Sequence, residues 1–309
     1  MNSEKEKFNL ITQPWIPCRM VDGHSSQLTF YGIEGVLKEA HNIREIVGEN
    51  PLVTISLHRL LLAVLYRCYG ELSYNGEWQE VWKAGRGVFE AAKIEGYLRR
   101  QDYPVRAKEK DGIPQTINIF ERFYLFDDKY PFYQFSEIQV PEPGKFSTAK
   151  LLFHDEGSAV LFEHLLQSSP PKLDAARAAR LLIAFHSFDV SGLKSRLPGV
   201  PNSAQISPLL KAAVSLARGK NLFQTLMLNL YWDDKDFFTK HCSYNGKPYQ
   251  DLPAWENDEI FSGDAREPRG YLELLTWQSR RIKLFPTSAE KPVTQVVIVA
   301  GNSFTKDFR

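Results

Sequence analysis

The chain has 309 residues, 43% of them hydrophobic, and its 38 Lys and Arg nearly balance 37 Asp and Glu, for a formal net charge of +1. This composition allows a globular protein of one or two domains. It excludes a uniformly basic nucleic-acid-binding protein, though not a local basic surface. The three cysteines (Cys18, Cys68, Cys242) are far apart and form no CxxC pair, so a reducing cytoplasm is expected. The charged N-terminus lacks the apolar core of a signal peptide, and no apolar run approaches the ~20 residues that cross a bilayer.

The opening segment predicts a hairpin. Residues 8–11 are a short apolar run that indicates a strand, which ends before Pro14 because proline removes a backbone donor and biases its predecessor. Trp15 is expected just beyond the strand, on a stiff arm between two prolines. The turn signal Asp22-Gly23 predicts that the chain folds back through residues 27–30.

Helical patterns follow the hairpin. Residues 32–47 are weakly helical. Residues 51–70 follow the polar cap Asn50, have Pro51 in the first turn and are apolar nearly all round, which predicts a helix central to the core. Arg59 and Arg67 lie on about one face of this helix, and we favour structural pairing over phosphate contact. Residues 76–100 show a second long helical pattern.

The middle of the chain is less regular. Residues 101–118 are polar and predict an exposed connection with strand character near 115–119, and residues 123–135 are rich in aromatic residues that we expect to pack together. Residues 172–188 predict a clear helix, and the long loop at 188–208 is of a length that is usually functional or disordered.

The C-terminal part predicts short helices and strands. Helices are expected at residues 209–217 and 222–232, and strands at 274–285 and 293–300. The fold class expected for residues 1–309 is therefore α+β: one large mixed domain, with antiparallel strands and hairpins packed on several helices around the leucine-rich helix.

No enzymatic motif is present in the sequence. Gly85-Arg86-Gly87 lacks the third glycine of a dinucleotide fingerprint and lies inside a helical pattern. His154, Glu156, Glu163 and His164 cluster, but their spacing matches no common metal site. We therefore predict no catalytic residue, no metal and no cofactor.

One loop carries residues suited to nucleic acid. Ser191, Gly192, Lys194, Ser195 and Arg196 combine flexible backbone with two cations, which suits phosphate or minor-groove contact, and an ordinary solvated loop explains them equally well.

A predicted strand and a helix start carry further cations. Arg281 and Lys283 share one face of the strand near Trp277, where they are suited to tracking a nucleic-acid backbone, and Arg280 lies on the other. A polar outer strand face is the alternative. Lys220 and Asn221 begin a helix, where N–H groups favour an anion, although helix capping alone explains Asn221.

An ordered set of segments resembles one known family. The opening Phe-Asn-Leu-Ile-x-x-Pro-Trp-Ile-Pro at 8–17 is followed by segments at 57–63, 161–164, 178–182, 219–226, 253–256 and 276–281. Together they resemble the CasA family, the large subunit of the type I-E CRISPR surveillance complex Cascade, whose N-terminal domain this chain would represent.

The resemblance implies a non-catalytic antiviral role. Such a subunit contacts the 5′ handle of the crRNA and double-stranded target DNA, senses the motif beside the target (PAM), helps start the R-loop and positions the nuclease. Its implied partners are the crRNA, target DNA, the other Cascade subunits (Cas5-, Cas7- and small-subunit-type proteins) and a helicase-nuclease or fused nuclease, with no membrane and no zinc. Sequence targeting is left to base pairing by the guide.

The resemblance also implies site residues. Residues 150–171 correspond to the loop that reaches the crRNA handle, which assigns Phe153, His154, Phe162 and His164 to that contact. Residues 191–196 correspond to the glycine-containing PAM-sensing loop, here with Gly192 as its one glycine.

Family members continue past residues 293–300 through a wedge element into a C-terminal helical bundle, so we expect that part to be absent from residues 1–309. Any nuclease activity would lie in a C-terminal fusion such as HNH or in a partner. The alternative function is a cytoplasmic, hydrolase-like α+β enzyme with an unrecognised active site. Duplex binding by the assembled complex discriminates the two.

Overall fold

A computed structural model describes residues 7–22, 27–69, 77–84, 87–110, 113–138, 144–152, 170–210, 212–230, 243–244, 247–248, 251–257, 265–286 and 288–305. The helices are α2 (Ile33–Lys38), α3 (Pro51–Tyr69), α4 (Glu77–Ala84), α5 (Ala91–Leu98), α6 (Ala175–Phe188), α7 (Leu222–Asn229) and α9 (Tyr271–Leu275). In the same described ranges lie the 3-10 turns η1 (Phe120–Phe123), η2 (Thr148–Leu152) and η3 (Ala254–Glu256).

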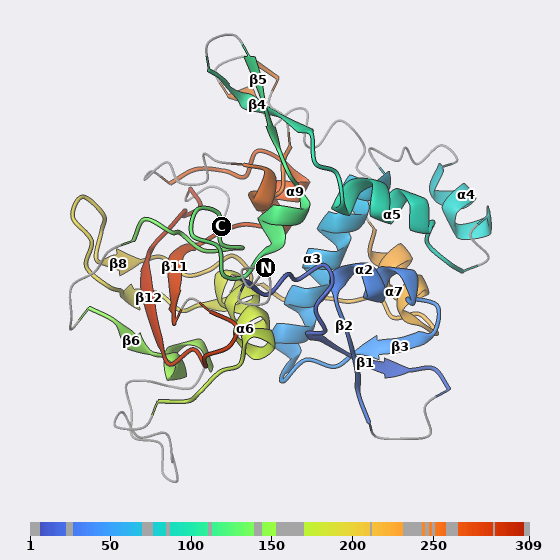
Figure 1. Cartoon of the computed structure of the whole chain (residues 1–309), viewed down its shortest axis with the longest axis horizontal. Helices are drawn as coiled ribbons and strands as arrows, with labels where there is room; N and C mark the ends of the chain where they lie inside the picture. The colour runs from blue at the N-terminus through green and yellow to red at the C-terminus, as the bar shows by residue number, and fades with distance from the viewer. Residues whose placement is uncertain are drawn as a thin grey trace.

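The strands form small antiparallel sheets around the helices (Figure 1). One sheet has the order β2 (Thr29–Tyr31), β1 (Ile16–Met20), β3 (Ile43–Ile46), and another the order β11 (Arg280–Phe285), β12 (Gln295–Ala300), β6 (Phe146–Ser147). Three further hairpins lie within the described residues: β4 (Tyr103–Lys110) with β5 (Ile113–Ile117), β7 (Gly192–Leu193) with β8 (Ser203–Ala204), and β9 (Ser243–Tyr244) with β10 (Lys247–Pro248). The predicted α+β class is confirmed.

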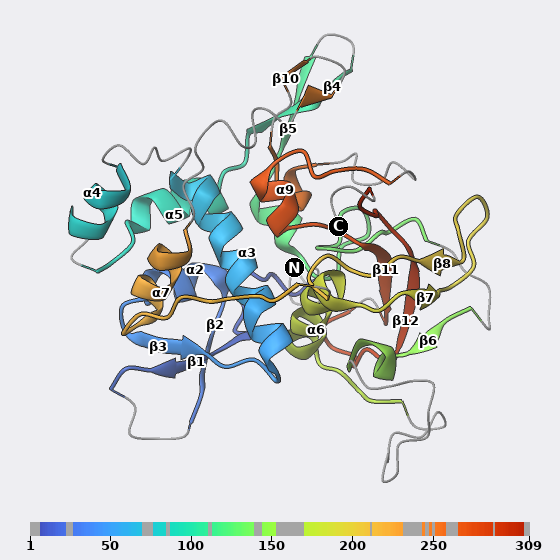
Figure 2. The same ribbon diagram turned by 180° about the vertical axis from the view of Figure 1, so that it is seen from behind.

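Helix α3 is the centre of the core, as predicted. Its start is defined by Asn50, whose side-chain oxygen accepts a hydrogen bond from the Val53 N–H at 3.0 Å, and by Pro51 in the first turn. By length and composition α3 is apolar enough to cross a membrane, but 56% of its most apolar window is buried inside the protein. It packs against α6 and α5 between the two larger sheets (Figures 1 and 2).

Arg59 and Arg67 have structural partners, as expected. Arg59 Nη2 donates to the carbonyl of Leu274 at 2.6 Å, and Arg67 pairs with the buried carboxylate of Glu256 at 2.7 Å. Both arginines therefore connect α3 to the C-terminal part of the chain.

The opening segment differs from its prediction. Residues 8–11 form only one antiparallel bridge, between Asn9 and Tyr124, and not a longer strand. The carbonyls of Leu10 and Ile11 instead accept hydrogen bonds from the N–H groups of Ile33 and Glu34. Trp15 is fully buried and its indole N–H donates to the Leu10 carbonyl at 2.8 Å, so it belongs to the core. The predicted hairpin exists one segment later, where β1 pairs with β2.

Several predicted boundaries were also wrong. Residues 32–47 form α2 and then β3, because pairing with β1 outweighs a weak helical propensity. Residues 76–100 contain two helices, α4 and α5, and the connection at 101–118 contains the β4–β5 hairpin. In the C-terminal part, α9 precedes β11 where one strand was predicted, and β12 is confirmed.

The described residues of 209–217 are not helical. At the end of this segment the side chain of Asn229 accepts from the Ala217 N–H at 3.0 Å and donates to the Ala217 carbonyl at 2.7 Å. These two bonds hold Ala217 against the last residue of α7.

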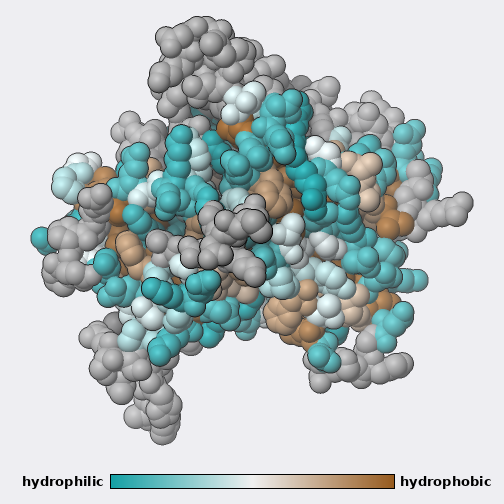
Figure 3. Space-filling model, in the orientation of Figure 1, coloured by the Kyte–Doolittle hydropathy of each residue, from teal (hydrophilic) through white to brown (hydrophobic). Residues whose placement is uncertain are grey.

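The aromatic residues of 123–135 pack as predicted. The rings of Phe123 and Phe132 stack with centroids 5.1 Å apart, and Trp255 lies 5.1 Å from Phe123. Hydrophilic residues dominate the face seen in Figure 3, with hydrophobic residues in small separate patches.

Candidate nucleic-acid interface

The β7–β8 hairpin, residues 190–205, carries the predicted DNA-proximal residues. Both ribbon views place it at the periphery, beside β12 (Figures 1 and 2). Gly192 has φ +135°, in the region that favours glycine. Ser191 and Arg196 are exposed, and Leu193 is 73% exposed, which is unusual for an apolar side chain of this size.

Lys194 and Ser195 point the other way. The Lys194 ammonium lies 2.8 Å from Asp189 Oδ2, and both side chains are almost fully buried. Ser195 Oγ donates to the Gly144 carbonyl at 2.8 Å, and the Ser195 N–H donates to the Ile298 carbonyl at 2.7 Å. Of the two cations predicted to face phosphate, the hairpin therefore presents Arg196 and holds Lys194 inside.

Arg280, the cation that the sequence places on the other face of the basic strand, is also buried. Its Nε donates to Asp189 Oδ2, and its Nη2 donates to the carbonyls of Val190 at 3.1 Å and Gln205 at 2.7 Å. Burial lowers the pKa of Lys194 and of Arg280, and the Asp189 carboxylate opposes this in both.

Arg281 and Lys283 lie on the opposite face of β11 from Arg280, as the alternation predicted. The Arg281 guanidinium lies 5.6 Å from the centre of the Phe135 ring, and Lys283 Nζ donates to the Ser136 carbonyl at 2.7 Å. Both are half-buried against residues 135–138, so their stems cover the sheet while part of each side chain reaches solvent.

Asn221 is the N-cap of α7. Its side-chain oxygen accepts from the Gln224 N–H at 3.0 Å, and Gln224 Oε1 in turn accepts from the Lys220 N–H at 2.9 Å. The bond from the Gln224 N–H to the Asn221 side chain confirms the capping interpretation. The Lys220 side chain is exposed, and Arg44 Nη1 donates to the Lys220 carbonyl at 3.3 Å, which brings a second cation to this end of α7.

The predicted crRNA-handle residues Phe153, His154, Phe162 and His164 lie outside the described residues. Within the described ranges, no three His, Cys, Asp or Glu side chains gather as a metal ion would require.

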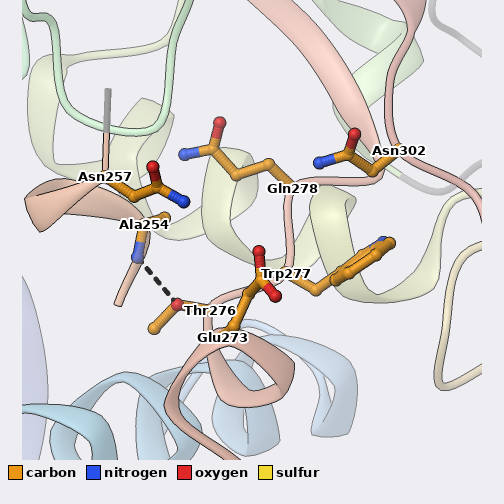
Figure 4. Close-up of a pocket in the computed structure, with 7 residues that line it drawn as sticks. All are labelled: Ala254, Asn257, Glu273, Thr276, Trp277, Gln278 and Asn302. Carbon is orange, nitrogen blue, oxygen red and sulfur yellow. Dashed lines mark hydrogen bonds between the residues drawn. The ribbon is translucent and has the colours of Figure 1, made fainter. Parts of the chain in front are cut away.

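A small pocket lies between η3, α9 and the end of β12. Figure 4 shows the Asn257 and Gln278 amides and the Glu273 carboxylate directed into a common space. Gln278 is 4% exposed, and its Oε1 has no hydrogen-bond partner among the described residues. The space open to the centre of a water molecule is about 10 Å³, which suits a single bound water rather than a substrate.

Sequence reasoning missed Asp189, the carboxylate that receives both buried cations. The available signal was a single acidic residue between the end of a predicted helix and a basic loop. Nothing local linked it to Arg280, which lies 91 residues further along the chain.

Comparison with known proteins places the chain in a family. The model of the family described as CRISPR-associated protein Cse1 matches residues 9–104 and 115–309. The chain is 32% identical over 287 residues to "CRISPR-associated protein CasA/Cse1" of Thermus thermophilus, a match that covers 90% of this chain and 49% of that protein. This chain thus spans about half the length of its curated relative.

Solved structures share the fold. The crystal structure of Thermobifida fusca Cse1 matches with a TM-score of 0.73 and 28% identity, over 99% of this chain and 54% of that one. A chain of a structure described as "CRISPR RNA-guided surveillance complex" matches with the same TM-score of 0.73 and 19% identity, over 97% of this chain and 57% of that one. Because the family model covers nearly the whole sequence, the chain belongs to the CRISPR-associated protein Cse1 family.

Proposed function

We propose that this chain is the N-terminal part of the non-catalytic large subunit of a type I-E CRISPR RNA-guided surveillance complex, acting in the cytoplasm. The observation that carries the proposal is the Cse1 family match over residues 9–104 and 115–309. The shared fold with a chain of a "CRISPR RNA-guided surveillance complex" supports membership in such an assembly. Its partners would be the crRNA, the other Cascade subunits, double-stranded target DNA and a nuclease.

The β7–β8 hairpin is the part we assign to the duplex beside the target, where the PAM lies. Arg196 offers an exposed guanidinium for phosphate, and Leu193 offers an exposed apolar side chain of the kind that wedges against base steps in a minor groove. Positioning by backbone and shape contacts suits a complex in which the guide reads the sequence.

The test uses the guide complex assembled with the full-length subunit. We expect duplex DNA carrying the PAM to bind the complete complex and not the complex lacking this subunit. Arg196→Ala should weaken binding and reduce the slope of log K against log salt by about one, because one phosphate contact is lost. The matched control is Lys93→Ala, which removes an exposed cation from α5 on another part of the molecule. Equal affinity and slope for Arg196→Ala and Lys93→Ala would remove Arg196 from the interface.

The crRNA-handle contact assigned to residues 150–171 needs a separate test. Replacing Phe153 and Phe162 together with Ala should release the subunit from the guide complex in co-purification. Retention of the double variant at wild-type stoichiometry would contradict this assignment. Turnover of a small metabolite by the purified chain alone would contradict the non-catalytic role.

A further inference from the structure

A polar junction holds the base of the β7–β8 hairpin, and Ser195 makes a separate attachment through its bonds to Gly144 and Ile298. Asp189, which follows the last residue of α6, lies at the start of the hairpin, and Gln205 to Ser207 lie at its end. Ser207 N–H donates to the Asp189 carbonyl at 2.9 Å, which closes the base of the hairpin. The start of β11 then holds both sides of this base through Ser279 and Arg280.

Arg280 bridges the two sides with a single guanidinium. One Nη2 group donates to Val190 on the outgoing side and to Gln205 on the returning side, while Nε donates to the Asp189 carboxylate. Ser279 Oγ donates to the His186 carbonyl at 2.6 Å and lies 2.8 Å from Ser207 Oγ. A planar fork with several donors suits this geometry, and a lysine ammonium would not reproduce it.

Lys194 reaches the same carboxylate from within the hairpin. Its ammonium lies 2.8 Å from Asp189 Oδ2 and 3.3 Å from the Val190 carbonyl, with only 2% of the side chain exposed. Asp189 is therefore shared by two buried cations, one from the base of the hairpin and one from the hairpin itself.

The hairpin needs such an anchor. β7 and β8 pair over two residues each, with Gly192 opposite Ala204 and Leu193 opposite Ser203, and so short a ladder does not hold a fixed orientation. Lys194 directly follows the exposed Leu193 and precedes Ser195 and Arg196. Lys194, together with the Ser195 bonds to Gly144 and Ile298, therefore sets where Leu193 and Arg196 face.

We propose that Asp189, Lys194 and Arg280 form a lock that positions the hairpin for duplex DNA, and that Lys194 acts through Asp189 rather than by touching phosphate. This inference rests on the proposed function of the hairpin. Lys194 and Arg280 are positioning residues in this scheme, and Leu193 and Arg196 make the contact.

The charges of the lock identify the variant to use. Removing Asp189 would leave two buried cations without their carboxylate, which is strongly destabilising. Removing the Lys194 charge leaves the Arg280–Asp189 pair intact, so the fold should survive. Lys194→Met keeps the long apolar stem, and Lys194→Arg keeps the charge and serves as the conservative control.

The experiment measures duplex binding by the assembled complex across a salt series. We expect Lys194→Met to weaken binding by about tenfold, a change of ~1.4 kcal/mol, with the wild-type salt slope, because no phosphate contact is lost. Arg196→Ala should lower the slope, and Lys194→Arg should restore near wild-type affinity. Arg280→Lys, which loses the fork and keeps the charge, should behave like Lys194→Met.

Hydrogen exchange on the same complexes measures directly how firmly the lock holds the hairpin. In Lys194→Met and Arg280→Lys, amides of residues 190–205 should exchange faster than in wild type, while α3 amides keep their protection. Wild-type affinity and exchange in Lys194→Met would overturn the lock. A reduced salt slope in Lys194→Met would overturn it too, since Lys194 would then contact phosphate. A wild-type complex that captures no duplex would instead overturn the proposed function, and the exchange result would still decide whether the lock exists.

Discussion

The guanidinium of Arg67 makes two parallel hydrogen bonds to the carboxylate of Glu256, with Nε to Oε1 at 2.8 Å and Nη2 to Oε2 at 2.7 Å. The pair joins the last turn of α3 to η3, 189 residues away in sequence. Tyr97 donates its hydroxyl proton to the same carboxylate, and Trp255 donates its indole N–H to the Tyr97 hydroxyl at 2.6 Å. One buried carboxylate thus connects three parts of the core.

Arg67→Met should destabilise the protein strongly. The Glu256 side chain is 1% exposed, so the substitution leaves a buried carboxylate without its cation, at a cost of about 3–5 kcal/mol. Urea unfolding followed by circular dichroism measures the change. Arg19→Met is the matched control: it removes an arginine that is 46% exposed from Glu45, and a surface pair contributes ~0–1 kcal/mol. Equal effects of the two variants would contradict the structural role of Arg67.

Asn221→Ala should cost about 1 kcal/mol of unfolding free energy, because the N-cap hydrogen bond to the Gln224 N–H is lost. Asn221→Asp keeps an acceptor at the same place and should retain most of the stability. Chemical denaturation of the three proteins tests this, with duplex binding by the assembled complex measured in parallel. Unchanged stability of Asn221→Ala together with lost duplex binding would indicate that Asn221 binds an anion rather than capping the helix.

Acid should destabilise the fold through His186. Burial lowers the pKa of His186 from its ordinary 6.5 to about 4. Its Nε2 lies 2.9 Å from the Tyr133 carbonyl and therefore donates, while Nδ1 is buried with no partner in the described part of the chain. The neutral ring is thus favoured in the folded state.

The sign follows from this depressed pKa. Between pH 6.5 and 4 the unfolded chain binds a proton at His186 that the folded protein does not bind. The contribution of neutral His186 to the free energy of unfolding is therefore complete above pH 6.5 and is lost as the pH falls toward 4. The full loss is on the order of 3 kcal/mol. His186→Gln keeps a donor for Tyr133 and should flatten the fall in urea-unfolding free energy between pH 7 and 5. Part of the fall should remain, because burial also lowers the pKa of His58. A fall of wild-type size in His186→Gln would disprove the assignment.

Cys18 and Cys68 should be unreactive in the native protein. Burial raises the pKa of Cys18 to about 12 and raises the pKa of Cys68 as well, so almost no thiolate is present at neutral pH. Alkylation with iodoacetamide, read by peptide mass spectrometry, should modify both residues only in denaturant. Rapid labelling of Cys18 without denaturant would show that this part of the core opens readily.

Local signals in the sequence were sufficient for some elements. The helix at Pro51–Tyr69 was predicted because a cap, a first-turn proline and a nearly continuous apolar composition all act within one segment. Asn221 was identified as an N-cap for the same reason, since its partner Gln224 lies three residues away. The order of weak motifs along the chain also indicated the family, which the Cse1 match confirmed.

Only the tertiary structure decided which cations face solvent. Lys194 and Arg280 were indistinguishable in sequence from exposed basic residues. In the fold both pair with the buried Asp189 carboxylate, which lies five and 91 residues before them in the chain. The strand expected at residues 8–11 is reduced to one antiparallel bridge, between Asn9 and Tyr124, because the carbonyls of residues 10 and 11 bond to residues 33 and 34. A side chain's burial and a strand's pairing depend on groups brought together by the whole fold, and no local pattern encodes where those groups will lie.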